Sequence, residues 1–510
     1  MEAFLSGFSV VLQFQYLAYM FAGVSLGLLF GFLPGLTGAM AIALMLPFSF
    51  GMPPLTALVF MLSIYTGGLF GGAVTAILIK TPGAPSNIMT TMDGYPMHCK
   101  GQSERALGLA LMSSVIGGIV GCLFLLVLCK PLAAIALKFS SAEMFMVMIF
   151  GLSVVGSLSN NPFKAIFSGL CGVLLGTVGV SVSGVPRGTL NSMYLLDGVP
   201  LTPALIGLVA LPEVFVLAAN PVIMAKQIDP QTQRAGSFQK LRGGCAETFR
   251  HLLQALVCSV TGVIVGIMPA AGASIAGLIT YNQSKQWSKK REQYGTGIPE
   301  GIVSCETANN AAEGGALATM FVLGIPGSGT TAMLLGALIV QGWSPGPKLF
   351  IDHQDVIYTA ISSLFCQQFV MLIVGGILCV LGAKLLKLPL NYLAPCILVI
   401  TVVGSFANRN ALFDCILLLG AGCVGWVMKK QDFPVMPLLL GLMLGSLADE
   451  NLIRIYQLYD SFWEIFTKPI PVVLGLISLL CIALPPVTRL IRRKETGTEN
   501  GWIGNHRGHS

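Results

Sequence analysis

Long stretches of this chain carry no charged residue. The charge-free stretches lie between Arg105 and Lys130, Glu143 and Lys164, Lys164 and Arg187, His251 and Lys285, Glu313 and Lys348, and Asp355 and Lys384. A helix needs roughly 20 apolar residues to cross a bilayer core, and the chain supplies that length repeatedly. The apolar and polar alternation of barrel strands is absent. The pattern predicts an all-α polytopic membrane protein with about ten to thirteen hydrophobic segments.

Composition supports this interpretation. Charged residues make up 10% of the 510 residues, against about 25% in soluble proteins, and the mean hydropathy is +0.80. The 13 cysteines include no C-x-x-C pair and lie mostly in apolar runs, so we expect them to act as small hydrophobes. The net charge of +7 gathers at the ends of hydrophobic segments, where basic residues indicate topology rather than nucleic-acid binding.

Two basic regions predict the orientation in the membrane. One contains Lys226, Arg234, Lys240, Arg242 and Arg250, and the other is "RLIRRKE" near the C-terminus. Both are expected on the cytoplasmic side, with the uncharged N-terminal region outside. This arrangement implies an odd number of crossings before the central basic stretch.

The two halves of the chain resemble each other. "GLLFGFLPG" (27–35) returns as "GVIVGIMPA" (262–270), and "VVGSLSN" (154–160) returns as "VVGSFAN" (402–408). Gly71, Thr75, Pro82 and Gly83 recur at the same spacings as Gly315, Thr319, Pro326 and Gly327. We therefore expect a first membrane repeat (1–220), a basic cytoplasmic connector (221–250), a second repeat (251–468), a final transmembrane helix (469–490) and a polar cytoplasmic tail (491–510). The odd number of crossings predicts inverted repeats.

Proline and glycine interrupt the apolar sequence at four places, in two matched pairs. These breaks are "FLPGLTG" (32–38), "IKTPGAPSNIMTTMDGYP" (79–96), "IMPAAGAS" (267–274) and "LGIPGSGTT" (323–331). Each break is expected to end one half-helix and start another. A half-helix N-terminus suits a carboxylate, and a C-terminus suits a cation. Matched breaks of this kind are typical of secondary transporters.

A polar stripe interrupts the second half at "SCETANNAAEGG" (304–315). Glu306, Asn309, Asn310 and Glu313 are spaced to share one helix face, and small residues (Ala308, Ala311, Ala312, Gly315) suit close packing on the other. We expect the stripe to line the transport pathway, facing the break at Pro326 and Gly327. The alternative is a water-exposed helix start.

The candidate substrate- and ion-binding residues come from the breaks and the stripe. They are Pro34, Gly35, Thr37, Lys80, Pro82, Gly83, Ser86, Asn87, Thr90, Thr91, Glu306, Asn309, Asn310, Pro326, Gly327, Ser328, Thr330 and Thr331. Glu313 is an alternative proton-coupling residue. Lys80 either snorkels toward an interface or contacts the substrate.

Motifs of other chemistries are missing or unconvincing. There is no P-loop and no H-E-x-x-H, and "GVSLG" (23–27) lies in apolar sequence without a preceding strand. We predict a transporter rather than an enzyme, with no catalytic residue, no metal centre and no cofactor besides a coupling ion, Na⁺ or H⁺. An intramembrane enzyme and a passive anion channel are the alternatives.

Five motifs together resemble the large membrane subunit of the tripartite tricarboxylate transporter family of bacteria. They are "GFLPGLTG", "YTGGLFGGAVTAIL", "TPGAPSNIMTTMDGYP", "GIPEGIVSCETANNAAEGG" and "LGIPGSGTTAMLLGALIVQGWSPGP". The resemblance implies ion-gradient-driven uptake of organic anions, mostly di- and tricarboxylates, across the inner membrane. It also implies two partners, a small membrane subunit and a periplasmic solute-binding protein.

The chain departs from the family pattern at three places. Lys80 stands where asparagine is more usual, Ala270 where glycine is expected, and "SCE" (304–306) replaces a typical "APE". Because Lys80 can change which anion fits, citrate is not assigned as the substrate.

Overall fold

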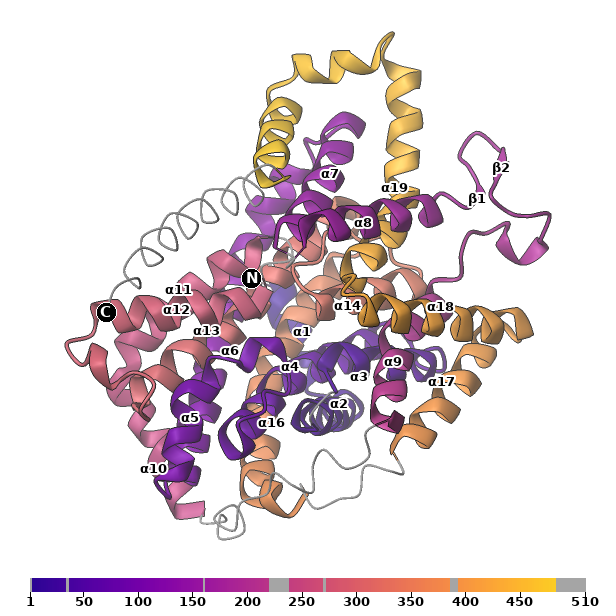
Figure 1. Ribbon diagram of the computed structural model, residues 1–510. Helices are drawn as coiled ribbons and strands as arrows, with labels where there is room; N and C mark the ends of the chain where they lie inside the picture. The colour runs from indigo at the N-terminus through magenta and orange to yellow at the C-terminus, as the bar shows by residue number, and fades with distance from the viewer. Residues whose placement is uncertain are drawn as a thin grey trace, which may run out of the picture. The chain divides into compact units, whose positions relative to one another are not determined.

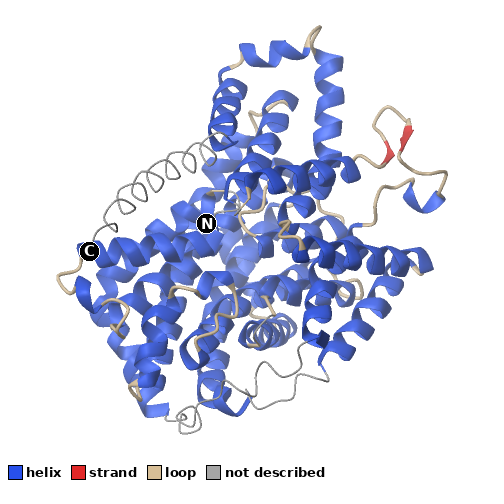
Figure 2. Ribbon diagram, viewed as in Figure 1, coloured by secondary structure: helices blue, strands red, loops and turns tan. Residues whose placement is uncertain are grey.

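The chain folds almost entirely into helices (Figures 1 and 2). The structure is a computed structural model that describes residues 2–33, 36–158, 161–219, 238–268, 272–385 and 393–482. Within these residues the only strands are β1 (Gly179–Val180) and β2 (Pro186–Arg187), which pair antiparallel. The predicted all-α class is therefore confirmed.

Many of these helices are apolar enough to cross a membrane. Seven described helices have the length and composition of spans: Phe14–Phe32, Pro54–Ile79, Ser103–Ala136, Phe238–Ile267, Gln354–Gly382, Leu412–Lys430 and Val435–Leu458. Seven shorter apolar helices accompany them: Gly38–Ser49, Ser141–Val154, Pro162–Gly176, Leu201–Val216, Gly329–Val340, Ala394–Ala407 and Pro469–Ile482. This inventory confirms a polytopic membrane protein.

The chain divides into two compact units, and each unit takes segments from both halves of the sequence. The larger contains Met1–Lys138 and Pro200–Gln431, and the smaller contains Phe139–Val199 and Asp432–Ser510. The helices of the larger unit are α1 (Glu2–Val11), α2 (Phe14–Phe32), α3 (Gly38–Ser49), α4 (Pro54–Ile79), η1 (Pro85–Asn87), α5 (Thr90–Cys99), α6 (Ser103–Ala136), α9 (Leu201–Ala219), α10 (Phe238–Thr248), η4 (Phe249–His251), α11 (Leu252–Ile267), α12 (Gly272–Trp287), η5 (Arg291–Gln293), α13 (Pro299–Leu323), α14 (Gly329–Val340), α15 (Pro347–Asp352), α16 (Gln354–Leu385), α17 (Leu393–Arg409) and α18 (Leu412–Lys430).

The smaller unit is built around two helices that pack through glycine. It contains α7 (Ser141–Leu158), α8 (Pro162–Gly176), β1, β2, η2 (Met193–Leu195), α19 (Val435–Leu458), η7 (Phe462–Thr467) and the helix Pro469–Ile482. A Cβ on Gly445 would lie 2.6 Å from Val173 O, so α8 and α19 approach too closely for a larger residue. Arg187 forms an ion pair with Asp449 at 2.7 Å, which ties the strand pair to α19.

Within the larger unit, equivalent helices of the two sequence halves pack in the same way. Gly31 and Gly71 bring α2 against α4, and their counterparts Gly266 and Gly315 bring α11 against α13. Each of these glycines faces backbone of the partner helix, which leaves no room for a side chain. The helix pairs therefore correspond between the halves, while the inverted orientation of the repeats stays a prediction.

All four predicted breaks separate two helices. The helices end at Phe32, Ile79, Ile267 and Leu323, and the next helical turns begin at Gly38, Pro85, Gly272 and Gly329. Each break therefore ends one helix and starts another, as predicted, but α2 (19 residues), α4 (26 residues) and α13 (25 residues), which end at three of the breaks, are longer than half-helices. Part of the first and third breaks (34–35 and 269–271) lies outside the described residues.

The structure adds detail to the predicted divisions of the chain. Within the predicted connector, residues 221–237 are not described, but 238–248 form α10. This helix packs on α6, where Gly108 lies against the backbone of Leu241 and Cys245. The predicted tail (491–510) lies outside the described residues, and the predicted final helix is described over Pro469–Ile482.

Candidate functional site

The polar stripe lies on α13, inside the larger unit. Every residue of α13 from Gly301 to Val322 is buried, and the four stripe side chains are at most 3% exposed. The alternative of a water-exposed helix start is therefore wrong. The small residues opposite the stripe pack as predicted, because Gly262 and Gly266 of α11 lie against the backbone of Ala308 and Ala312.

Glu306 is the centre of a hydrogen-bonded cluster drawn from three other elements. Its carboxylate accepts hydrogen bonds from Thr90 Oγ1 of α5, from Asn87 Nδ2 of η1 at 3.4 Å and from Ser114 Oγ of α6 at 3.2 Å. These three donors are neutral and buried. The second break, which supplies Asn87 and Thr90, therefore folds directly onto the stripe.

Several amide oxygens in this cluster have no hydrogen-bond partner within the described residues. They are Oδ1 of Asn87, Asn309 and Asn310, all in side chains with no exposed surface. The amide nitrogens of two of them are engaged: Asn87 Nδ2 also donates to Leu69 O at 3.2 Å, and Asn310 Nδ2 donates to Glu306 O at 3.0 Å. A buried oxygen acceptor without a partner costs free energy unless a ligand binds to it.

Three half-helix N-termini meet at the fourth break. A Cβ on Gly38, the first residue of α3, would lie 3.8 Å from Thr330 Cγ2, and one on Gly272, the first residue of α12, would lie 3.1 Å from Ser328 Cβ. Ser328 is the N-cap of α14. The partial positive ends of α3, α12 and α14 therefore point into one region formed by both halves of the chain.

Ser328 and Thr331 form a capping box at the start of α14. Thr331 N donates to Ser328 Oγ at 3.2 Å, and Ser328 N donates to Thr331 Oγ1 at 2.8 Å. The N–H groups of Gly329 and Thr330 fall between them, in the first turn, where no intrahelical acceptor exists. Thr37 caps α3 in the same manner by accepting from Met40 N at 3.3 Å.

The glycines of the second and fourth breaks permit close backbone contact. Gly83 N donates to Gly72 O at 3.3 Å, and Gly83 lies against the backbone of Gly31. Its counterpart Gly327 lies against Ala316 and Gly266, where an added Cβ would be 2.7 Å from Ala316 Cβ. Pro82 and Pro326 precede these glycines and are half-buried and buried, respectively.

The remaining predicted residues lie at the edge of this region or outside the description. Lys80 is exposed, ends α4 in a left-handed conformation (φ 58°) and holds its Nζ 5.6 Å from the centre of the Tyr95 ring. Thr91 Oγ1 donates to Ile88 O within its own turn. Ser86 is buried, and its carbonyl faces Gly277 of α12. Pro34 and Gly35 are among the residues not described.

Sequence reasoning missed Asp93, which fastens the second break to the start of α13. Its carboxylate accepts from Tyr281 Oη at 2.8 Å and from the backbone N–H groups of Gly295, Gly297 and Ile298 at 2.8–3.0 Å. Asp93 has no exposed surface. An acidic residue inside the motif "TTMDGYP" was the available signal.

Sequence reasoning also missed the partners of Glu313. Thr66 of α4 lies between Glu313 and Gln367, with its Oγ1 2.9 Å from Glu313 Oε1 and 3.0 Å from Gln367 Oε1. All three side chains are buried. The signal for Gln367 was the pair "QQ" in the charge-free run between Asp355 and Lys384.

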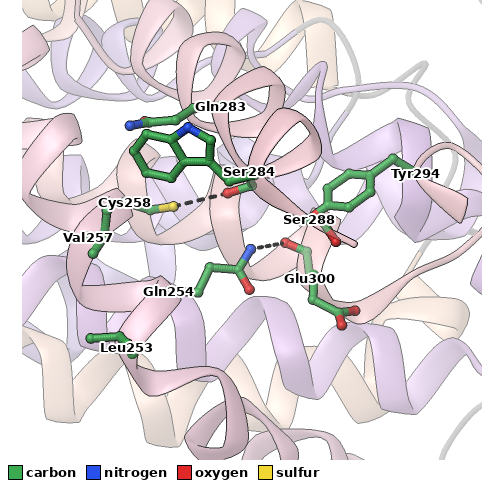
Figure 3. A pocket seen from close by; sticks show the side chains of 10 residues that line it. Leu253, Gln254, Val257, Cys258, Gln283, Ser284, Ser288, Tyr294 and Glu300 are labelled. Atoms are coloured by element: carbon green, nitrogen blue, oxygen red, sulfur yellow. Dashed lines mark hydrogen bonds between the residues drawn. The ribbon is translucent and has the colours of Figure 1, made fainter. Parts of the chain in front are cut away.

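A separate pocket lies between α11, α12 and the start of α13 (Figure 3). Its volume is about 310 Å³, and its polar contacts include a hydrogen bond from Gln254 Nε2 to Glu300 O at 3.0 Å. It is lined by Leu253, Gln254, Val257, Cys258, Gln283, Ser284, Trp287, Ser288, Tyr294 and Glu300. None of the predicted site residues is among them.

Comparisons with known proteins identify the family of the chain. A family model described as "Tripartite tricarboxylate transporter TctA family" matches residues 17–440. An uncharacterised 52.8 kDa protein in the TAR-I ttuC' 3' region of Agrobacterium vitis is 33% identical over 446 residues, covering 86% of this chain and 87% of that protein. An uncharacterised protein in the TAR-II ttuC' 3' region of the same organism is 31% identical over 224 residues, covering 44% of this chain and 93% of that protein.

No solved structure matches the chain significantly. The family model, however, spans most of the sequence, including all four breaks and the polar stripe. The chain therefore belongs to the tripartite tricarboxylate transporter TctA family and is a multi-pass membrane component of a tripartite transporter.

Proposed function

We propose that this chain carries organic anions of the di- and tricarboxylate class across the bacterial inner membrane, coupled to the entry of Na⁺ or H⁺. In this proposal a periplasmic solute-binding protein delivers the anion, and a small membrane subunit completes the transporter. Membership of the family supports the type of system. The geometry of the breaks and of the stripe supports the roles of individual residues.

The observation that carries the proposal is the meeting of three half-helix N-termini at Ser328 and Thr330. Free N–H groups and the partial positive charge of each helix end favour an anion there. Residues 328–330 are half-exposed, so an incoming carboxylate can reach them. Hydroxyl groups at this place come from Thr37, Ser328, Thr330 and Thr331. Gly327, which has no side chain, keeps the backbone close enough for contact with the anion.

The cluster around Glu306 is the proposed cation site. It combines a buried carboxylate with amide oxygens of Asn87, Asn309 and Asn310 that lack partners. Oxygen atoms of these types are the ligands that hard cations prefer. A cation there would satisfy the amide oxygens and balance the carboxylate, which no charged side chain contacts through a hydrogen bond or ion pair within the described residues.

Lys80 stands apart from both regions. Its exposed side chain beside Tyr95 is compatible with placement at a membrane interface and with contact to an anion entering the site.

Two substitutions on α13 test the cation site. Glu306→Gln removes the charge and Asn310→Ala removes an amide oxygen, so each should reduce cation-dependent uptake at least about tenfold, equivalent to about 1.4 kcal/mol. Uptake is measured in correctly inserted protein against external Na⁺ and pH. Ser304→Ala is the matched control, because Ser304 is buried on the same helix and its hydroxyl donates only to Gly301 O.

The control should keep normal uptake and normal ion dependence. If Glu306→Gln and Asn310→Ala behave like Ser304→Ala, the stripe only packs the helix and the cation site is wrongly assigned.

A further inference from the structure

The hydroxyl of Thr66 contacts two acceptor atoms at once. It lies 2.9 Å from Glu313 Oε1 and 3.0 Å from Gln367 Oε1, both within hydrogen-bond distance. A threonine hydroxyl has a single proton and can donate it to only one of these oxygens. Either the Glu313 carboxyl group or the Gln367 amide must therefore donate a proton to the Thr66 hydroxyl.

The orientation of the Gln367 amide decides which group that is. Its Nε2 donates to Val59 O at 3.4 Å and lies 3.2 Å from Ser363 Oγ, whose own proton is donated to Ala360 O. Turning the amide over would place Oε1 3.4 Å from the carbonyl oxygen of Val59, and its contact with Ser363 Oγ would need the proton that Ser363 donates to Ala360 O. Gln367 Oε1 therefore faces Thr66 and accepts its proton.

Glu313 must then supply the remaining proton. A carboxylic acid at Glu313 donates to Thr66 Oγ1, and Thr66 donates to Gln367 Oε1, so every contact has one donor and one acceptor. An ionised Glu313 would leave two acceptors competing for one proton inside the protein. Only 3% of the Glu313 side chain is exposed, and a buried ion without a counter-charge is costly.

Among the described residues, no positively charged side chain forms a hydrogen bond or ion pair with Glu313. The titratable side chains that face it are Tyr65 on α4 and Cys122 on α6, both neutral. On α13 itself, Glu306 lies two turns away, and α11 packs against the opposite face. The charged helix α15, with Lys348 and Asp352, meets the end of α13, where Phe350 and Leu323 pack against the cluster that contains Val322.

Tyr65 connects this acid to the proposed anion site. Its side chain lies near that of Ser328, the N-cap of α14, and near Glu313. An anion at the α14 N-terminus would repel an ionised Glu313, because screening is weak inside the protein. Proton binding at Glu313 and anion binding at Ser328 should therefore favour each other.

We propose that Glu313 is held as a neutral carboxylic acid by Thr66 and Gln367, and that it binds the proton that promotes anion binding in the transport cycle. The protonation state is inferred from this hydrogen-bond geometry together with the burial of Glu313. The role in transport rests on the proposed function. Glu306 keeps the separate role of a cation ligand.

Infrared spectroscopy of the purified full chain at neutral pH tests the protonation state. The wild type should show the carbonyl-stretch band of a neutral carboxylic acid that Glu313→Gln lacks, and Thr66→Val should shift this band by removing the acceptor of the acid proton. Glu313→Gln is expected to fold, because its amide can donate to Thr66 as the acid does. Glu300→Gln is the control for an ionised group, since Glu300 pairs with Lys290 at 3.2 Å.

The infrared difference spectrum between the wild type and Glu300→Gln should show only bands of an ionised carboxylate. If the difference spectrum between the wild type and Glu313→Gln also shows only such bands, the proposal is overturned. Loss of the neutral-acid band in Glu313→Gln supports it.

Uptake of citrate and succinate into proteoliposomes, with both partner subunits present, tests the role in transport. The pH dependence of wild-type uptake should flatten in Glu313→Gln, and the dependence on external cation should persist. If the pH dependence of uptake by Glu313→Gln is identical to that of the wild type, the coupling role is overturned. If neither gradient drives uptake by the wild type, the proposed function fails, and the infrared result still decides the state of Glu313.

Discussion

Single buried side chains hold the candidate site together, and Asp93 is the clearest example. One carboxylate accepts three backbone N–H groups ahead of α13 and the hydroxyl of Tyr281 on α12. It thereby fixes α5 against the start of the helix that carries Glu306. A residue with this many donors is expected to be structurally essential, since each donor left unpaired in the interior is costly.

Asp93→Ala should lower the free energy of unfolding by about 3 kcal/mol or more, because two buried and two partly buried donors lose their acceptor. Asp93→Asn keeps one acceptor oxygen and should cost less. The measurement is thermal unfolding of the purified protein in detergent. Glu292→Ala is the control, since Glu292 is exposed in the same connecting segment. Equal melting temperatures for Asp93→Ala and the control would show that the carboxylate does not fasten this loop.

At the scale of helices, small residues decide which surfaces meet. Gly117 and Gly121 of α6 lie against the backbone of Thr307 and Ala311 on α13, so the two helices touch along their main chains. Ser114 on the same face of α6 thereby comes within 3.2 Å of Glu306. The close approach of α6 and α13 is thus part of the proposed cation site.

Gly117→Ala should destabilise this contact by about 1–3 kcal/mol, because the added methyl group overlaps Thr307 O and overpacking forces the helices apart. The same substitution should weaken cation-dependent uptake by withdrawing Ser114 from Glu306. Thermal unfolding and uptake are measured together. Gly420→Ala is the matched control, since it lies in a helix with no atom within 4 Å of an added Cβ. A Gly117→Ala protein as stable and active as Gly420→Ala would contradict the role given to this contact.

For the whole molecule, the sequence predicted local features well. Apolar length predicted the membrane-spanning class, and Pro and Gly placed all four breaks, because backbone chemistry at those residues acts locally. The spacing of Glu306, Asn309, Asn310 and Glu313 also predicted that these residues lie on one helix, α13, where all four are buried. These features depend on residues close together in the chain.

Contacts between distant segments could not be predicted in the same way. The pairing of Thr66 with Glu313 and Gln367, and of Asp93 with Gly297, joins residues far apart in the sequence. Their proximity depends on how α4, α5, α13 and α16 pack, and helix packing in membranes is set by the combined fit of many small side chains. The inverted orientation of the repeats remains a prediction for the same reason. The substrate and the coupling ion also remain predictions.

Gradient-driven accumulation tests the central claim most directly. The full chain is reconstituted in proteoliposomes with its small membrane subunit, and radiolabelled citrate or succinate is supplied with or without the periplasmic binding protein. With an inward Na⁺ or H⁺ gradient and the binding protein present, the account predicts accumulation of the anion above its equilibrium level, and little uptake at low substrate when the binding protein is omitted. Uptake that stops at equilibrium under both gradients would indicate a passive channel. Chemical conversion of the anion would indicate an enzyme. Either result would contradict coupled transport.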